Sequence, residues 1–392
     1  MIEYSNITNF NLSVEDKFLL ECLRDKDRSN FAEISSGSKS ELNWKLIAKK
    51  STENGISQLL FKKQKLIDLP IEIAEYFKKQ YYATLAKNTL IYNKLDEIIS
   101  EFRKEDIELV LLKGCLLAET VYNDIGQRPM GDFDILIEKK NLEKSYIILT
   151  KLGYKKLHNK NEFIEKLQLT YNYGYVKDMQ LLELHWDLLP PHCIHSINID
   201  DFFSTKQKIK ISNSETYMFA PEFLLIHLCL HLSRNFGAGG VRLCWYVDIK
   251  KTSEIFKSTI NWDVLLEKSN TFSITNIVLS HLFIAYKYFD TEIPAHLFAN
   301  KNFNNVEQLF LKLYSLGVQK KLAKTDLSYY KKVMHIEGFL NKIRFLMGNL
   351  FPSVDYIKSK YSIKSNLYAY FFYPIEIFLL IKKVKINLFK LS

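Results

Sequence analysis

Two aspartates stand one residue apart at the head of a short apolar run, DFDILIE at residues 132–138. Alternate residues of a β-strand point to the same face, so Asp132 and Asp134 project together while Phe133 points into the core. Two neighbouring carboxylates repel each other and resist ionising unless a cation lies between them. Mg²⁺ is the natural cation, because it binds carboxylate oxygens and completes its shell with substrate phosphates and water. The pair therefore predicts a metal site on a buried strand; the alternative is two solvated aspartates at an exposed strand end.

The segments around this run predict a small α+β module. Short apolar runs bounded by turn residues indicate strands, and apolar positions at helical spacing indicate helices. The expected elements are a strand at 107–112, a helix at 115–122, a strand at 132–138, a helix at 142–154 that closes on a glycine, and strands at 167–176 and 179–189 joined as a hairpin at a Lys-Asp pair.

Helical patterns dominate on both sides of this module. We expect a helix at 13–25 and one long helix, or two in series, at 70–105. Beyond Pro221 the chain is expected to be overwhelmingly helical, because its segments carry amphipathic helical patterns. A chain of 392 residues is long enough for two domains. The expected organisation is an N-terminal helical region at 1–85, an α+β core at 86–215 and a C-terminal helical domain at 216–392.

The balance of charge favours anionic partners. Lys and Arg number 54 against 44 Asp and Glu, which gives a formal net charge of +10. Nucleotides and phosphorylated substrates fit this excess, and nucleic acid is a less favoured partner because lysine is abundant throughout the chain. The five cysteines form no C-x-x-C pair and the N-terminus carries no apolar export segment, so we expect reduced thiols and a cytoplasmic protein.

The most hydrophobic stretch, residues 367–381, is interrupted by Pro374 and Glu376 and is too short to cross a membrane. We expect it to form a helix packed on the protein's own core. The alternative is that this stretch and the basic sequence after it, KKVKINLFK, lie on an anionic membrane surface.

A candidate phosphate-binding turn lies in LLKGC at 111–115. Gly114, between a strand and a helix, lets the backbone approach a ligand, and the free N–H groups at the helix start favour an anion. Lys113 can meet the phosphate charge directly. Most Lys-Gly pairs are simple turns, but this one precedes the D-x-D strand by a single helix.

A third acidic position occurs in LLELHWDL, where Glu183, His185 and Asp187 alternate with apolar residues. Any half-exposed strand shows such alternation. If this strand lies beside 132–138, however, Glu183 becomes a third carboxylate at the metal site. His185, on the same face, is a second candidate for the base or for the wall of the cleft. Three carboxylates, two Mg²⁺ ions and a triphosphate are the apparatus of two-metal nucleotidyl transfer.

Together, LLKG, RPMGDFDILI and ELHW resemble the nucleotidyltransferase superfamily whose best known member is DNA polymerase beta. More narrowly, they are similar to a bacterial family of largely uncharacterised nucleotidyltransferases with an Arg-Pro-Met-x-Asp-x-Asp signature. The resemblance spans residues 109–189 and the family's usual extent reaches the helices near 250. It implies a mixed sheet and transfer of a nucleoside monophosphate from a nucleoside triphosphate such as ATP.

The resemblance also assigns roles to residues. Asp132 and Asp134 match the metal-bridging pair, Glu183 matches the third carboxylate that holds the catalytic metal and activates the acceptor, and Gly114 matches the phosphate turn. Mg²⁺ is implied, as two ions, with Mn²⁺ as a substitute. The superfamily's turn usually reads Gly-Ser or Gly-Gly, whereas Cys115 follows the glycine here and the hydroxyl is missing.

Other candidate residues surround this set. Arg128 either clamps a phosphate or pairs with a nearby acid. His231, Arg242 and Asp248 are expected on the far wall of the cleft, where a base, ribose or acceptor would rest. His227 and His231 lie at i and i+4, but no third zinc ligand accompanies them, so a zinc site is not favoured.

The leading prediction is a Mg²⁺-dependent nucleotidyltransferase acting on a small molecule, a peptide or protein, or an RNA end. One alternative is a degenerate member that binds a nucleotide or a partner without turnover, and the presence of all three acids argues against it. Another is a nucleic-acid-binding scaffold that uses the basic C-terminal segments.

Overall fold

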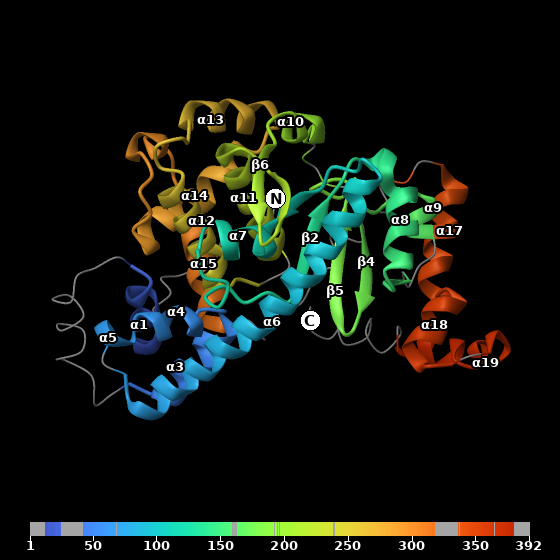
Figure 1. The fold of residues 1–392 in the computed structure, drawn as a ribbon, viewed down its shortest axis with the longest axis horizontal. Coiled ribbons are helices and arrows are strands. Elements are labelled where there is room, and N and C mark those ends of the chain that lie inside the picture. Colours follow the sequence, from blue (N-terminus) through green and yellow to red (C-terminus); the bar gives the residue numbers. More distant parts are fainter. Residues whose placement is uncertain are drawn as a thin grey trace.

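The computed structural model describes residues 12–24, 42–67, 69–158, 163–191, 193, 195, 197–237, 240–317, 336, 338–363 and 365–379. Figure 1 shows a central sheet crossed by one long helix, α6. Helices α11 to α14 gather at one side of the sheet, and helices α17 to α19 lie at the opposite end of the molecule.

A seven-stranded mixed sheet forms the centre, in the order β3-β4-β5-β2-β1-β7-β6. Its strands are β1 Val110–Leu112, β2 Asp132–Leu136, β3 Lys155–Lys156, β4 Asn172–Lys177, β5 Gln180–His185, β6 Gln207–Ile211 and β7 Ser214–Met218. β2 pairs with β5, and β1 with β7, in parallel; the other neighbours are antiparallel. The expected α+β class with a mixed sheet is confirmed.

The hairpin of β4 and β5 turns at Asp178 and Met179, one residue later than the Lys-Asp pair suggested. Both residues have positive φ, 50° and 59°, as a two-residue hairpin turn with the right-handed strand twist requires. The expected strand at 167–176 is shorter than predicted, since strand pairing starts only at Asn172. The β6–β7 hairpin was not predicted, although Lys and Ile alternate in QKIKI and a Ser-Asn pair follows it.

The N-terminal helices lead into α6, which is one unbroken helix of 34 residues. Pro70 occupies the position just before its first residue, where the missing N–H of proline removes no hydrogen bond of the helix. These helices are α1 Val14–Cys22, α3 Trp44–Glu53, α4 Ser57–Lys62, α5 Gln64–Ile67 and α6 Ile71–Lys104. Because α6 runs through residue 85, no loop marks a boundary there, and the three-part domain division stays a prediction.

The remaining helices connect the strands or follow them. Within the sheet region they are α7 Lys113–Thr120, η1 Lys139–Asn141, α8 Leu142–Lys151, α9 Phe163–Lys166 and α10 Ile199–Ser204. Beyond the sheet they are α11 Pro221–Gly237, α12 Leu243–Ile255, α13 Trp262–Thr271, α14 Thr275–Phe289, η2 Ala295–Phe298, α15 Asn304–Leu316, α17 Phe339–Leu350, α18 Val354–Tyr361 and α19 Asn366–Tyr370. Gly153 follows α8 with φ +85°, as a glycine that closes a helix does.

One large apolar core joins the sheet to the helices from α1 to α15 other than α9. Phe133 and Ile135 of β2 are fully buried in it, on the face opposite the aspartates because successive strand residues alternate between the two faces. The aspartates therefore sit on a strand anchored by its other face. None of the helices in the described part of the chain is long and apolar enough to cross a membrane.

The stretch at 367–381 differs from its expected packing. In its described part, to residue 379, Leu367, Phe371 and Phe378 are exposed, and only Ala369 and Glu376 are buried. The prediction that this stretch packs on the protein's own core was wrong, because α18 and α19 pack on each other at the end of the molecule.

Candidate functional site

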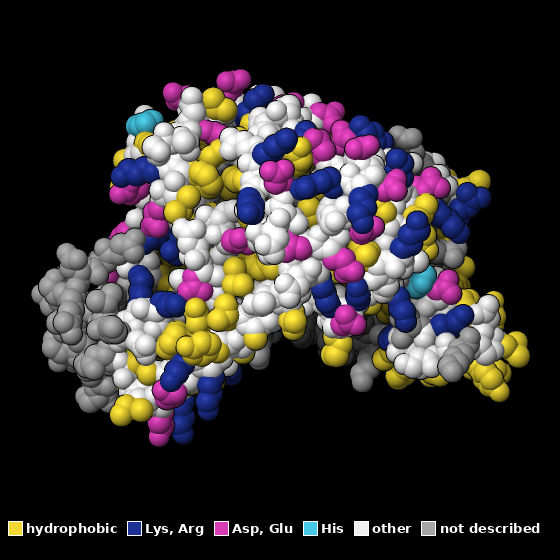
Figure 2. Space-filling view, viewed as in Figure 1, with side chains coloured by type: hydrophobic (Ala, Val, Ile, Leu, Met, Phe, Trp, Pro, Cys, Tyr) yellow, Lys and Arg dark blue, Asp and Glu magenta, His cyan; other side chains and the backbone are white. Residues whose placement is uncertain are grey.

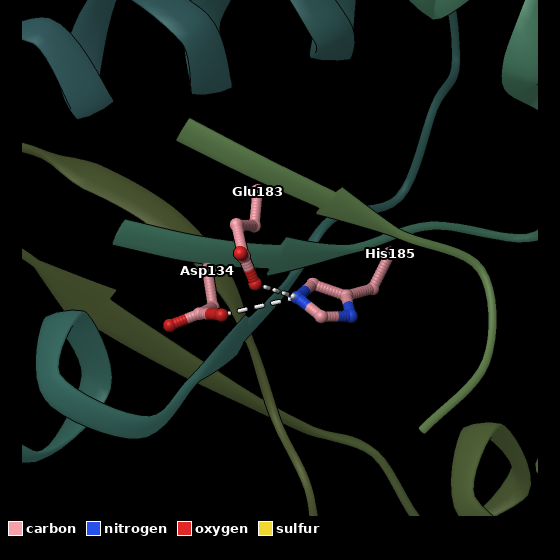
Figure 3. A group of neighbouring side chains, drawn as sticks. All are labelled: Asp134, Glu183 and His185. Carbon is pink, nitrogen blue, oxygen red and sulfur yellow. Dashed lines mark hydrogen bonds and ion pairs between the residues drawn. The ribbon is translucent and has the colours of Figure 1, made fainter. Parts of the chain in front are cut away.

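The parallel pairing of β2 and β5 brings the acidic residues together. Asp134 lies opposite Glu183 in register, and Leu136 lies opposite His185, so these side chains share one face. His185 Nε2 lies 3.0 Å from Asp134 Oδ1 and 3.2 Å from Glu183 Oε2, and Figure 3 shows the three side chains converging. The neighbouring strand that the third carboxylate requires is therefore present.

These three side chains form a donor set that suits a divalent metal ion. One ligand atom from each of Asp134, Glu183 and His185 lies within 4.8 Å of the others. Carboxylate oxygens suit Mg²⁺ and Mn²⁺, and an imidazole nitrogen also suits transition metals. Asp187, the next polar residue of the alternation, turns instead to its own backbone and accepts from Leu188 N at 2.6 Å.

Lys113 is the counter-ion of Asp134. Its Nζ donates to Asp134 Oδ1 at 2.6 Å; the Asp134 side chain is buried and that of Lys113 is partly exposed. Burial alone would lower the pKa of Lys113, but the charges of Asp134, Glu183 and Asp132 outweigh it and raise that pKa. Burial alone would likewise raise the pKa of Asp134, but Lys113 and His185 hold it below the usual value. An ammonium group thus stands at a carboxylate that can bind a metal.

Asp132 carries the charge that Lys113 does not balance. Its pKa is raised by burial and by the nearby charges of Asp134 and Glu183, against the opposing effect of Lys113. A cation bound at this face would relieve that repulsion. The donor set and its surplus of negative charge therefore fit a divalent ion.

A cavity of about 370 Å³ opens beside Asp132 and Asp134. It is lined by Lys113, Gly114, Arg128, Pro129, Met130, Gly131, Asp132, Asp134, His231, Asn235, Gly240, Val241, Arg242 and Trp245. The predicted phosphate turn, the D-x-D strand, the C-terminal half of α11 and the start of α12 thus meet at one cavity, which gathers most of the predicted site residues. Glu183 and His185 adjoin it through Asp134.

Gly114 packs closely against Met130 in the turn. A Cβ at this position would lie 2.9 Å from Met130 Cγ, so any larger residue would force the Met130 side chain to shift. The next residue, Cys115, donates through Sγ to Leu112 O at 3.0 Å and to Asp134 O at 3.1 Å. Burial raises the pKa of this thiol to about 12. In place of the superfamily's hydroxyl, the chain has an unreactive thiol that ties the turn to β2.

Arg128 pairs with an acid, the second of the two roles expected for it. Its Nε and Nη2 donate to Asp248 Oδ1 and Oδ2, both at 2.7 Å, and Tyr122 Oη donates to Asp248 Oδ1 at 2.8 Å. The side chains of Arg128 and Asp248 are both buried. Asp248 therefore fastens the RPMGD loop to α12 and has no open face toward the cavity, while a phosphate-binding role for Arg128 stays a prediction.

The histidines of α11 lie on the side of the site. His231 lines the cavity with its ring 5.0 Å from that of Trp245, and Arg242 lies 5.8 Å from the same indole. His227 is buried, and neither ring nitrogen has a hydrogen-bond partner among the described residues. Burial, together with Lys113, lowers the pKa of His227 to about 3. Neither α11 histidine belongs to the metal-ligand group found in the described part of the chain.

Three side chains next to the donor set were not predicted from the sequence. Asn172 Nδ2 donates to Glu183 Oε2 at 3.1 Å, and the ring of Tyr171 lies 5.6 Å from that of His185. Arg234 stacks 4.9 Å from the Tyr171 ring. Asn172 lies opposite His185 in the β4–β5 register, so only the strand pairing reveals its role.

A larger cavity of about 1000 Å³ begins where β2 and β5 end. Tyr171, Trp186 and Asp187 line it together with Glu138 and three lysines, Lys139, Lys140 and Lys166. Because Tyr171 also contacts His185, this cavity comes within one aromatic ring of the metal donors. The two cavities thus flank the polar face of β2 and β5 along its length.

Comparison with known proteins gives one family match. The model of a family described as uncharacterised nucleotidyltransferase matches residues 40–290. No curated protein matches the chain.

Two solved structures show distant similarity. The antibiotic-resistance factor ANT(2'')-Ia is 11% identical, with a TM-score of 0.35, over 50% of this chain and 98% of its own. An antigenic nucleotidyltransferase-like protein from Paracoccidioides brasiliensis is 14% identical, with a TM-score of 0.31, over 53% of this chain and 96% of its own.

Proposed function

Because the chain belongs to this family of uncharacterised nucleotidyltransferases, we propose that it transfers a nucleoside monophosphate from a nucleoside triphosphate to an acceptor in a metal-dependent reaction. The observation that carries the proposal is the convergence of Asp134, Glu183 and His185 from two parallel strands, beside the cavity at the phosphate turn. In the proposed reaction an acceptor oxygen bonds to the α-phosphorus, and pyrophosphate leaves.

Asp132, Asp134 and Glu183 are proposed to hold Mg²⁺, as two ions, with Mn²⁺ as a substitute; His185 is a further donor within reach. The bound ions would supply positive charge to the phosphate oxygens and lower the pKa of a bound hydroxyl. The surplus negative charge that raises the pKa of Asp132 supports this assignment.

Glu183 is proposed to take the proton of the acceptor hydroxyl. Its Oε2 is oriented by Asn172 at 3.1 Å and by His185 at 3.2 Å. Lys113 and the backbone of Gly114 are proposed to receive the phosphates, since both line the cavity next to Asp132. For Lys113 to do so, its ammonium must leave Asp134 as the metal arrives.

The two cavities suit two substrates. The smaller one carries the phosphate turn and is assigned to the nucleotide. The larger one, which reaches His185 through Tyr171, is assigned to the acceptor. Its mixture of lysines, acids and aromatic rings fits a polar acceptor, whether a small molecule, a peptide or an RNA end.

The test is transfer of label. The purified protein is incubated with Mg²⁺, a cell extract and each α-labelled nucleoside triphosphate in turn. We expect one labelled acceptor, and no labelling by the Glu183→Gln variant. Tight Mg²⁺-dependent nucleotide binding without any transfer would favour the degenerate alternative instead.

A further inference from the structure

The last helices of the described chain, α17, α18 and α19, lie beyond the family-matched residues 40–290 and at one end of the molecule. α17, α18 and α19 form the red group at the right of Figure 1. α17 contacts α9, where Phe345, Ile336 and Leu169 form a small apolar cluster separate from the main core. These helices are thus attached to the rest of the protein through α9 and this small cluster, and they contribute no side chain to the proposed metal site.

The outer surface of this group is apolar. The exposed fraction is 77% for Phe339, 71% for Leu367 and 72% for Phe371. Leu340, Met347, Phe351, Tyr368, Tyr370 and Phe378 are also exposed. Figure 2 shows hydrophobic atoms gathered over α19 at the lower right. Single exposed apolar residues are ordinary, whereas a concentration of this kind marks an interaction site. We call these nine residues the C-terminal apolar surface.

The same part of the chain is strongly basic. Residues 338–392 contain nine Lys or Arg and only two acidic residues, a net charge of +7 in a chain of net charge +10. One of the two acids, Glu376, is buried and accepts hydrogen bonds from Lys360 and Tyr361. This segment is therefore basic in sequence, and in its described part Lys342 and Arg344 lie on α17 and Lys358 on α18, beside the C-terminal apolar surface.

We propose that the C-terminal apolar surface docks this protein onto an anionic lipid bilayer. Phe, Tyr and Leu side chains insert at the boundary between headgroups and acyl chains, and neighbouring lysines are attracted to anionic headgroups. The contact is peripheral, because no described helix is long and apolar enough to span a membrane.

Two other partners fit this surface less well. The centre of a protein–protein interface is depleted in lysine. A nucleic acid would use the lysines and stack on the aromatic rings, but it gives no reason to expose the aliphatic side chains of Leu340, Met347 and Leu367.

The test is co-sedimentation of the full-length protein with vesicles of phosphatidylcholine, with and without phosphatidylglycerol, over a salt series. We expect binding to the anionic vesicles that weakens but does not vanish with salt, because the apolar contribution is not screened. The double substitution Phe371→Ser and Phe378→Ser should weaken binding by about tenfold or more, since each change removes an aromatic side chain that inserts into the bilayer surface in the proposed complex. Leu90→Ser, which removes an exposed apolar side chain of α6, is the matched control and should bind like the parent.

A second variant keeps the test independent of folding. Lys342→Gln with Arg344→Gln changes only charge on the surface of α17. It should weaken binding at low salt and make the remaining binding less sensitive to salt, because fewer charges are left to be screened. Thermal melting and nucleotide affinity should match the parent for every variant. Parent protein that stays in solution with anionic vesicles, or a Phe371/Phe378 variant that binds like the parent, overturns the proposal. Steeply salt-dependent binding to RNA together with indifference to vesicles would assign the surface to nucleic acid instead.

Discussion

Lys113 Nζ lies 2.6 Å from Asp134 Oδ1, so a lysine neutralises the carboxylate that the proposed metal requires. The two cations compete for one oxygen. In the absence of metal the ion pair stabilises the fold, because an unpaired buried charge costs about 3–5 kcal/mol. We therefore expect Lys113→Met to lower the melting temperature without metal.

The same variant should respond more strongly to metal. With the ammonium gone, Mn²⁺ or Mg²⁺ no longer competes with a lysine for Asp134, so metal should raise the melting temperature of Lys113→Met more than that of the parent. Affinity for a triphosphate should fall, because the proposed phosphate ligand is lost. Equal metal-induced shifts in the melting temperature of the two proteins, measured by scanning calorimetry, would refute the competition.

The two hydrogen bonds from Arg128 to Asp248 predict a structural role for Arg128. Arg128→Met leaves Asp248 buried without its partner and should lower the free energy of unfolding by about 3–5 kcal/mol. Adding Asp248→Leu removes the stranded charge, so the double variant should regain most of that loss in urea denaturation. If Arg128→Met leaves stability unchanged and weakens nucleotide binding alone, the arginine is a phosphate ligand.

His281 makes the stability of the fold depend on pH. It is buried against Tyr246 Oη at 3.0 Å, and burial lowers its pKa to about 3 from the usual 6.5. The unfolded chain binds a proton below pH 6.5 whereas the folded protein does not until about pH 3. The contribution is therefore present above pH 6.5 and is lost as the pH falls toward 3, by about 1 kcal/mol between pH 6.5 and 5.5. Urea denaturation of His281→Gln should show a pH dependence shallower by that amount; identical slopes would contradict it.

Glu183 and His185 can be told apart by kinetics. A residue that acts on the attacking hydroxyl contributes in the transition state, so Glu183→Gln should bind nucleotide within a few-fold of the parent and lose about 10²- to 10⁴-fold in single-turnover transfer. His185→Ala is the control, because its Nε2 lies within reach of the same carboxylates. An inactive His185→Ala beside an active Glu183→Gln would make the histidine the base.

The sequence predicted the acidic residues of the site because each belongs to a local pattern. Asp132 and Asp134 share one strand, and Glu183 and His185 alternate along another, so their faces follow from period-two spacing alone. The pairing of the two strands is not local. It was inferred from the resemblance, and the parallel register of Asp134 with Glu183 confirms it.

The ion pairs could not be predicted in the same way. Arg128 and Asp248 are separated by 120 residues, and Lys113 and Asp134 by 21, so no spacing rule connects them. The lysine also has a left-handed backbone conformation, φ +48°, which sequence patterns do not predict for a residue other than glycine. The partners of these charged residues depend on tertiary packing.

Asp132 provides the most direct test of the proposed metal site. Its pKa is raised by burial and by the charge of Asp134, and no lysine pairs with it directly among the described residues, so Asp132→Asn should leave the metal-free melting temperature unchanged or higher. Titration calorimetry of a nucleoside triphosphate with and without Mg²⁺ is the measurement. We expect Asp132→Asn to lose Mg²⁺-dependent binding while remaining folded. Mg²⁺-dependent binding equal to that of the parent would contradict it.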